Sequence, residues 1–312
     1  MKHFRRFTAA LLGMLLLTGC AAANSESHSD SVAESSALPA EKSLVTLGDS
    51  ISAGFGLDDP AAERYSALVK DYLESRDQSV WNDYNYAVSG DNSTDLIRKL
   101  NNGRALHAPS ADKIILYIGA NNLLGAYTEY MTDKAEENGI DLDNFDSITD
   151  EQIEDLQSQI EAEMQDSETI MQEIQGRIDR NLEQLESDLE TIYQWIRERN
   201  PEAEVYVLNI YNPYSAGLES EMLPDDIDFE EYAQSQIDRA NALIQSLTET
   251  HTDLIPVDVA SAFAACDPLP VIGKNGSEDS SDAAADYYDP HPTAEGQRVI
   301  ADAVREVMET KA

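Results

Sequence analysis

Cysteine is nearly absent from this chain of 312 residues, which contains only Cys20 and Cys266. Cys20 stands in the N-terminal segment, so a framework of disulfide bonds within a folded domain is excluded. Cys266 follows the apolar residues 262–265 and precedes an Asp-Pro pair, with no histidine nearby in the sequence. We therefore expect a buried thiol at the end of a helix and not a cysteine nucleophile.

Basic residues are also scarce. The chain has 21 lysines and arginines against 60 aspartates and glutamates, a formal net charge of −39 at pH 7. This charge disfavours nucleic acids, anionic membrane surfaces and polyanionic substrates, because the protein would repel them. The five histidines show no spacing typical of a metal site. We expect neither a metal nor another cofactor.

Long apolar runs are lacking too, and the run Ala9–Leu17 is too short to cross a membrane. It follows a basic start that contains Lys2 and Arg5, which is typical of an export signal. It ends in Leu17-Thr-Gly-Cys20, which resembles the lipobox of bacterial lipoproteins, where the cysteine is lipidated and begins the mature chain. We expect residues 1–19 to be removed and Cys20 to anchor the protein to the cell membrane, outside the cytoplasm.

The anchor is followed by a tether and a domain. Residues 20–42 are rich in serine, alanine and glutamate and show no hydrophobic period, which favours a flexible tether. Residues 43–312 have the length of one large domain. We expect this domain to be a monomer.

Strand and helix signals alternate along the domain, which is typical of an α/β fold with a parallel sheet. The longest helix signal has a seam of isoleucines and leucines from Ile170 to Ile192 and ends at Asn200-Pro201, since the residue before a proline disfavours a helix. Five short apolar runs predict strands, near 44–47, 80–88, 113–118, 204–210 and 254–259. Helical spacing predicts helices near 61–75, 95–100, 167–199, 229–250 and 292–311.

Residues 127–166 interrupt this alternation. They are acidic, contain few apolar residues and follow the third predicted strand. We interpret them as an insertion with one or two helices. Because loops at the carboxyl ends of strands surround the ligand in such folds, the insertion is a candidate lid. The alternative is a solvated surface excursion.

The segment Gly48-Asp49-Ser50 follows the first predicted strand and turns sharply. Ser50 is therefore expected at the carboxyl end of a strand, where open α/β sheets bind ligands. By itself the tripeptide also fits an ordinary serine at a helix N-terminus. It is not the Gly-x-Ser-x-Gly elbow of α/β-hydrolases, because Ser52 stands at the second glycine position.

Three more polar positions follow strands or precede the last helix. Gly90 follows the second strand, Asn121 follows the third, and His291 precedes the final helix. Carboxyl ends of parallel strands share one edge, so these residues can converge with Ser50. A serine needs a base, which His291 supplies. The N–H groups of Ser50 and Gly90 and the amide of Asn121 can donate to an oxyanion.

These motifs resemble those of the SGNH hydrolases, the GDSL esterase/lipase family. The matching segments are Gly48-Asp-Ser50, Val88-Ser-Gly90-Asp-Asn-Ser, Gly119-Ala-Asn121 and His291-Pro292. The resemblance implies a flavodoxin-like three-layer sandwich with a five-stranded parallel sheet, no metal, and hydrolysis of carboxylic esters or thioesters. It also implies that Ser50 is the nucleophile, His291 the base, and Gly90 and Asn121 oxyanion donors.

One motif departs from the family pattern. The family usually has Asp-x-x-His, but Tyr288 stands three residues before His291. The nearest carboxylates are Asp289 and Asp286. A third group must bind Nδ1 of the histidine and fix its tautomer. We predict Asp289, with Asp286 or a backbone carbonyl as the alternatives.

The chain is thus expected to be an extracytoplasmic serine esterase that forms an acyl-serine intermediate. The acyl or O-acetyl group would come from a lipid, a glycan or a small molecule. The alternative is a non-catalytic envelope lipoprotein that binds acylated ligands. The complete set of Ser50, Gly90, Asn121 and His291 favours the enzyme.

Overall fold

The computed structural model describes residues 41–140, 167–214, 228–275 and 287–311, with Thr149 and residues 151–152, 155–156 and 158 between the first two ranges. The expected signal peptide, Cys20, nearly all of the tether and Asp286 lie outside the described residues, so the expectations about them stay predictions. No helix within the described ranges combines the length and apolarity needed to cross a bilayer.

The core of the domain is a five-stranded parallel sheet with the order β2-β1-β3-β4-β5, which confirms the predicted fold class. Strand β2 lies beside β1 on one side within the sheet, and β3 lies beside β1 on the other side. The segments that follow β1 and β3 therefore lie next to each other at a topological switch point, where ligands bind in such sheets. The strands are β1 (Lys42–Gly48), β2 (Trp81–Asn85), β3 (Lys113–Tyr117), β4 (Glu204–Leu208) and β5 (Leu254–Val257).

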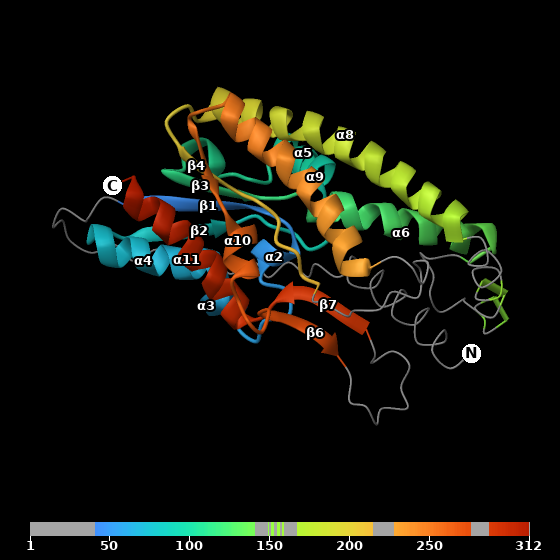
Figure 1. Ribbon diagram of the computed structural model, residues 1–312. Coiled ribbons are helices and arrows are strands. Elements are labelled where there is room, and N and C mark those ends of the chain that lie inside the picture. The colour runs from blue at the N-terminus through green and yellow to red at the C-terminus, as the bar shows by residue number, and fades with distance from the viewer. Residues whose placement is uncertain are drawn as a thin grey trace.

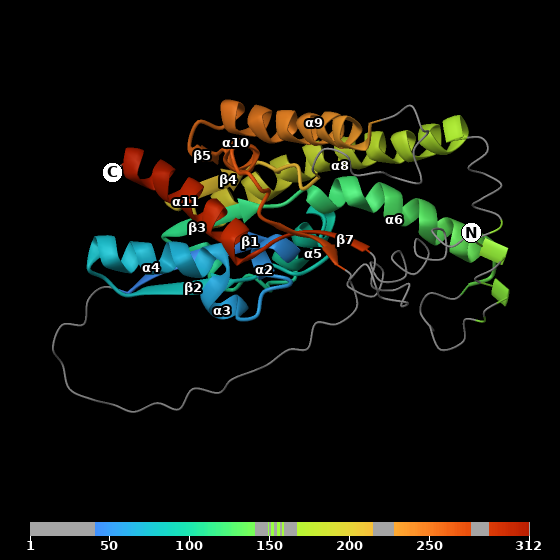
Figure 2. The same cartoon turned by 60° about the horizontal axis from the view of Figure 1, so that its bottom comes forward.

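Helices cover both faces of the sheet and make three layers (Figures 1 and 2). One layer contains α5 (Ser93–Asn101), α6 (Ala120–Glu137), α8 (Ser167–Arg199) and α9 (Phe229–Thr250). The other contains α4 (Tyr65–Asp77), α10 (Val259–Ala264) and α11 (Ala294–Thr310). Short elements fill the connections: α2 (Ser50–Ala53), α3 (Pro60–Glu63) and η1 (Ala108–Ser110).

Side chains alternate along the strands between the two cores. On β1, Val45 and Leu47 join the core under α8, whereas Leu44 joins the core under α4 and α11. All three are fully buried. A parallel sheet covered on both faces needs apolar residues at successive positions, and the continuous apolar runs in the sequence reflect that.

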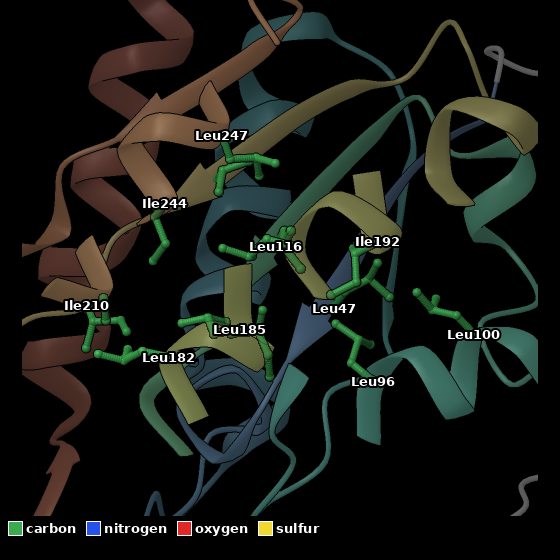
Figure 3. Close-up of a cluster of buried hydrophobic side chains, with 14 of the residues drawn as sticks. Leu47, Leu96, Leu100, Leu116, Leu182, Leu185, Ile192, Ile210, Ile244 and Leu247 are labelled. Atoms are coloured by element: carbon green, nitrogen blue, oxygen red, sulfur yellow. The ribbon is translucent and has the colours of Figure 1, made fainter. Parts of the chain in front are cut away.

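The long helix α8 has the predicted bounds, and every member of its predicted seam is buried. Figure 3 shows Ile192 of this helix near Leu47 and Leu116 of the sheet, and Leu182 beside Ile210. The helix ends where the side chain of Asn200 donates to the carbonyls of Ala108 and Ala111, each at 2.9 Å. These bonds tie the end of α8 to η1.

Helix α6 begins directly after Gly119 and continues to Glu137. The first part of the expected insertion, residues 127–137, is therefore the continuation of a helix that starts at the sheet. Most of residues 141–166 lie outside the described residues, so the role of this segment as a lid stays a prediction.

The sequence did not predict the antiparallel hairpin of β6 (Val271–Asn275) and β7 (Tyr287–Pro292). His291 lies on β7, whose two prolines obscure a strand pattern. The final helix begins at Ala294 and not at Pro292, because the Thr293 hydroxyl caps it by accepting the N–H of Gly296 at 3.3 Å. The helix expected over 61–75 is divided into α3 and α4 at Arg64, which is extended.

Candidate active site

Ser50 is positioned by the end of β1 and the start of α2. A Cβ atom on Gly48 would lie 2.3 Å from Ser52 Oγ, so the turn requires glycine. The carboxylate of Asp49 caps α2 by accepting the N–H of Ile51 at 3.0 Å. Ser50 is the first residue of α2 and is 8% exposed. Its hydroxyl therefore comes from a fixed backbone.

His291 lies between Ser50 and Asp289. Its Nε2 is 2.8 Å from Ser50 Oγ, and its Nδ1 is 2.6 Å from Asp289 Oδ1. The structure thus brings together three residues that the sequence predicted, in the order nucleophile, base and orienting carboxylate. A hydroxyl in this arrangement can pass its proton to the imidazole as it attacks an electrophile.

Asp289 is held in place by burial and by a hydrogen bond to the residue that follows it. It is 3% exposed. The next residue, Pro290, accepts a hydrogen bond from the Tyr211 hydroxyl through its carbonyl at 2.8 Å. The structure places Asp289, the predicted orienting group, at Nδ1 of His291, whereas Asp286 lies outside the described residues.

Three N–H donors lie on the segments that follow β1, β2 and β3. Gly90 has φ +84°, a conformation that favours glycine. Within the described part of the chain, the backbone N–H groups of Ser50 and Gly90 donate to no other group. Asn121 donates one amide hydrogen to the Asp91 carbonyl at 2.9 Å and keeps the second for a ligand. These groups can hold a developing oxyanion.

Two buried carboxylates border this site. Burial raises the pKa of Asp49 to about 7; the N–H of Ile51 and the nearby His291 oppose this shift, and Asp91 adds to it. Burial also raises the pKa of Asp91, although its ion pair with Lys99 opposes that shift. Near neutral pH, a fraction of Asp49 is therefore protonated.

Residues 46–299 match the model of the GDSL-like lipase/acylhydrolase family. This chain belongs to that family. The matched range contains Ser50, Gly90, Asn121 and His291, which are the residues that the structure places around the carboxyl edge of the sheet.

A curated relative of this GDSL-like protein is the uncharacterized protein YpmR of Bacillus subtilis (strain 168), which is 26% identical over 207 residues. The match spans 66% of this chain and 65% of that relative, just under two thirds of its length.

Solved structures with the same fold come from several bacteria. The extracellular lipase from Streptomyces rimosus is 20% identical, with a TM-score of 0.53 over 85% of this chain and 99% of that one. Phospholipase A1 from Streptomyces albidoflavus NA297 is 20% identical, with a TM-score of 0.54 over 88% and 100%. The acetylxylan esterase Axe2 from Geobacillus stearothermophilus is 16% identical, with a TM-score of 0.50 over 85% and 94%. At these identities the likeness shows the fold.

Phe55 contacts His291, the predicted base of this family member. The two ring centroids are 4.5 Å apart, with the planes tilted by 43°. Gly54 and Gly56 on either side both have φ +79°, and a Cβ on Gly56 would lie 2.6 Å from Ile272 Cδ1. The two glycines thus form a tight loop that holds Phe55 against the imidazole of His291.

His107, His251 and the free Cys266 lie outside this site and contact other parts of the fold. His107 stacks on Tyr84 at 3.6 Å between centroids. His251 follows α9, and its Nε2 lies 2.7 Å from Glu190. The prediction that Cys266 is buried is wrong: the residue is half-buried, because α10 ends on the surface. The Cys266 thiol contacts the Ala262 carbonyl at 3.3 Å. Within the described ranges, no cluster of three or more His, Cys, Asp or Glu side chains could hold a metal.

Sequence reasoning missed two buried polar residues that support the site. Gln297 on α11 is fully buried and bridges Ile51 and Tyr65. Asp188 on α8 is 5% exposed and accepts two hydroxyl groups from the start of α5. Each occupies a helical position in line with buried apolar residues, and a polar residue on an apolar seam is the signal that marks such positions.

Proposed function

We propose that this protein is a serine esterase that hydrolyses carboxylic esters through an acyl-serine intermediate. The observation that carries the proposal is the continuous contact from Ser50 through His291 to Asp289, at 2.8 and 2.6 Å. Membership of the GDSL-like lipase/acylhydrolase family supports an ester hydrolase. The names of the structural neighbours, which include a lipase, a phospholipase and an acetylxylan esterase, support the same class.

In the first half of the proposed reaction, Ser50 Oγ attacks the carbonyl carbon while its proton passes to His291 Nε2. The carbonyl oxygen becomes an oxyanion and accepts hydrogen bonds from the N–H groups of Ser50 and Gly90 and from the Asn121 amide. The bond between carbon and the alcohol oxygen then breaks. His291 gives its proton to that oxygen, the alcohol leaves, and the acyl group stays on Ser50.

In the second half, water attacks the acyl-serine and gives its proton to His291. The same three donors hold the second oxyanion, and the acid leaves when His291 returns the proton to Ser50 Oγ. Asp289 accepts the Nδ1–H of His291 in both halves, which keeps Nε2 free to accept a proton and stabilises the imidazolium that forms.

We also infer that the enzyme works outside the cytoplasm, held on the cell membrane by a lipid on Cys20. The support is the basic start, the short apolar run, the Leu17-Thr-Gly-Cys20 segment and the tether-like composition up to residue 42. The first strand runs from Lys42 toward Ser50, so the tether joins the sheet at the edge opposite to the catalytic edge. The active site would then face away from the point where the tether joins the domain.

The activity is tested with p-nitrophenyl esters from acetate to palmitate and with a fluorophosphonate probe. The wild type should hydrolyse a subset of the esters and be labelled. Ser50→Ala should lose labelling and about six orders of magnitude in kcat, as removal of a serine nucleophile does elsewhere. Labelling that persists in Ser50→Ala, or a folded wild type without activity on any ester or the probe, would reject the proposal.

The anchor has a separate test. Cells grown with a radiolabelled fatty acid should transfer label to the wild-type protein and not to a Cys20→Ser variant. Equal labelling of both proteins, or none of either, would reject lipidation at Cys20 without bearing on the esterase.

A further inference from the structure

Asp188 is a buried carboxylate at the middle of α8 that belongs to none of the family motifs. Its Oδ2 accepts the hydroxyls of Ser93 and Thr94, each at 2.7 Å, and its Oδ1 accepts the amide of Gln184 at 2.8 Å. Ser93 and Thr94 are the first two residues of α5. A carboxylate from the long helix therefore fastens the first turn of another helix, 95 residues away in the chain.

The same contacts continue to the segment after β3. Asn122 is 4% exposed, accepts the N–H of Ser93 at 3.1 Å and donates to the Ser93 hydroxyl at 2.8 Å. The Ser93 hydroxyl donates its hydrogen to Asp188, which leaves a lone pair of Ser93 Oγ for the amide of Asn122.

These bonds join the two segments that carry oxyanion donors. Asn122 directly follows Asn121, and Ser93 is three residues after Gly90. Asn121 in turn donates to the carbonyl of Asp91. The position of the Gly90 N–H relative to the Asn121 amide thus depends on where α5 begins, and Asp188 holds the beginning of α5.

We infer that Asp188 is a positioning residue of the oxyanion hole, acting through Ser93 and Asn122 on the Gly90 and Asn121 donors. The inference rests on the proposed esterase function and adds a residue to it. Oxyanion donors must be placed accurately where charge develops, and a misplacement of about 1 Å can lower the rate about 100-fold. Loss of Asp188 should therefore affect the transition state and spare the binding of substrate.

The test compares Asp188→Ala and Asp188→Asn with Asp179→Asn. Asp179 lies on the same helix but pairs with Arg239 on the surface, so it is the matched control. With p-nitrophenyl acetate, Asp188→Ala should lower kcat about 100-fold and leave KM within about 3-fold. Asp188→Asn keeps the shape of the side chain and should lose less. Asp179→Asn should match the wild type.

A double-mutant cycle separates positioning from general loosening of the fold. If Asp188 acts through the oxyanion donors, Asp188→Ala should lower kcat by a smaller factor in Asn121→Ala than in the wild type, because Gly90 is then the donor on these two segments that is left to be misplaced. The affinity for an alkylboronic acid, which forms a tetrahedral adduct with a serine, should fall by the same factor as kcat. Losses that multiply in the cycle, or a boronate affinity that stays at the wild-type value, would overturn the inference.

Two further measurements keep the inference testable. If Asp188→Ala does not fold, Thr94→Val removes one hydrogen bond to Asp188 at nearly constant volume and should lower kcat several-fold without raising KM. The NMR signals of the Asn121 side-chain amide, assigned by their loss in Asn121→Ala, should shift in Asp188→Asn and stay in place in Asp179→Asn. This readout does not require ester hydrolysis, so it distinguishes failure of the inference from failure of the proposed function.

Discussion

Asp289 holds His291 twice with one oxygen atom: Oδ1 accepts the backbone N–H of His291 at 2.9 Å and lies 2.6 Å from its Nδ1. An aspartate that accepts the N–H two residues ahead forms a local turn. In this turn the imidazole ring of His291 folds back, so that its Nδ1 also lies against Oδ1 of Asp289. A spacing of two residues can therefore replace the family's usual spacing of three, which explains how the departure in the sequence is compatible with an intact site.

Asp289→Asn should lower kcat by about three to four orders of magnitude. An amide at this position can present N–H to Nδ1 and favour the wrong tautomer of His291. The matched comparison is Asp286→Asn, which should stay within a few-fold of the wild type in the same p-nitrophenyl ester assay. If Asp286→Asn is inactive and Asp289→Asn is active, the orienting carboxylate is Asp286. If both variants remain active, a backbone carbonyl orients the ring.

Asn121→Ala should lower kcat by about 100- to 1,000-fold, the usual effect of losing one oxyanion donor. KM should change little, because the second amide hydrogen of Asn121 is needed only when negative charge develops. Steady-state kinetics with Gln245→Ala as the control would check this, since Gln245 binds Glu249 on the exposed side of α9. A raised KM with normal kcat would show that Asn121 binds the ground state of the substrate instead.

The fold could be read from the sequence because its signals are local. Continuous apolar runs mark strands buried on both faces, and the seam of α8 and the Asn200-Pro201 pair define the bounds of that helix. Ser50, Gly90 and Asn121 could be placed because each follows a strand of a parallel sheet. The topology alone brings such positions to one edge.

The rest depends on contacts between distant segments. The β6–β7 hairpin that carries His291 has no alternating pattern, because prolines occupy two positions of β7. Asp188 meets Ser93 only after α8 has packed beside α5. Phe55 reaches His291 only when the loop between Gly54 and Gly56 closes on β6. None of these pairings has a spacing that a single sequence displays.

The stability of the protein should depend on pH through Asp49. Burial raises its pKa to about 7, whereas an aspartate in an unfolded chain has a pKa of about 3.9. Between these values the folded protein holds a proton that the unfolded chain has released. The stabilisation is therefore fully present below about pH 4 and is lost as pH rises toward 7, by about 1.4 kcal/mol per pH unit.

Asp49→Asn isolates this effect, because asparagine also caps helices and does not titrate. Urea denaturation of both proteins should show the variant gaining on the wild type between about pH 4.5 and pH 7, with a constant difference above that range. Titration of other groups cancels in this difference. A difference that does not vary with pH would show that the carboxyl of Asp49 ionises normally in the folded protein.

Gln297 should stabilise the segment that carries Ser50. It is fully buried on α11, donates to the Ile51 carbonyl at 2.9 Å and accepts the Tyr65 N–H at 2.9 Å. Gln297→Leu would leave the Tyr65 N–H buried without a partner, at a cost of about 1 to 3 kcal/mol, whereas the Ile51 carbonyl would keep the N–H of Gly54 at 3.3 Å. We expect the free energy of unfolding, measured with urea, to fall by about 1 to 3 kcal/mol.

The matched control is Gln194→Leu, because Gln194 binds Glu190 on the exposed side of α8 and its loss should change stability by less than about 0.5 kcal/mol. Since Ile51 directly follows Ser50, a loosened α2 should also slow fluorophosphonate labelling of Ser50 at temperatures where Gln297→Leu is still folded. Slower labelling without loss of stability would assign Gln297 to the site alone. Unchanged stability and unchanged labelling together would show that neighbouring groups satisfy the Tyr65 N–H without Gln297.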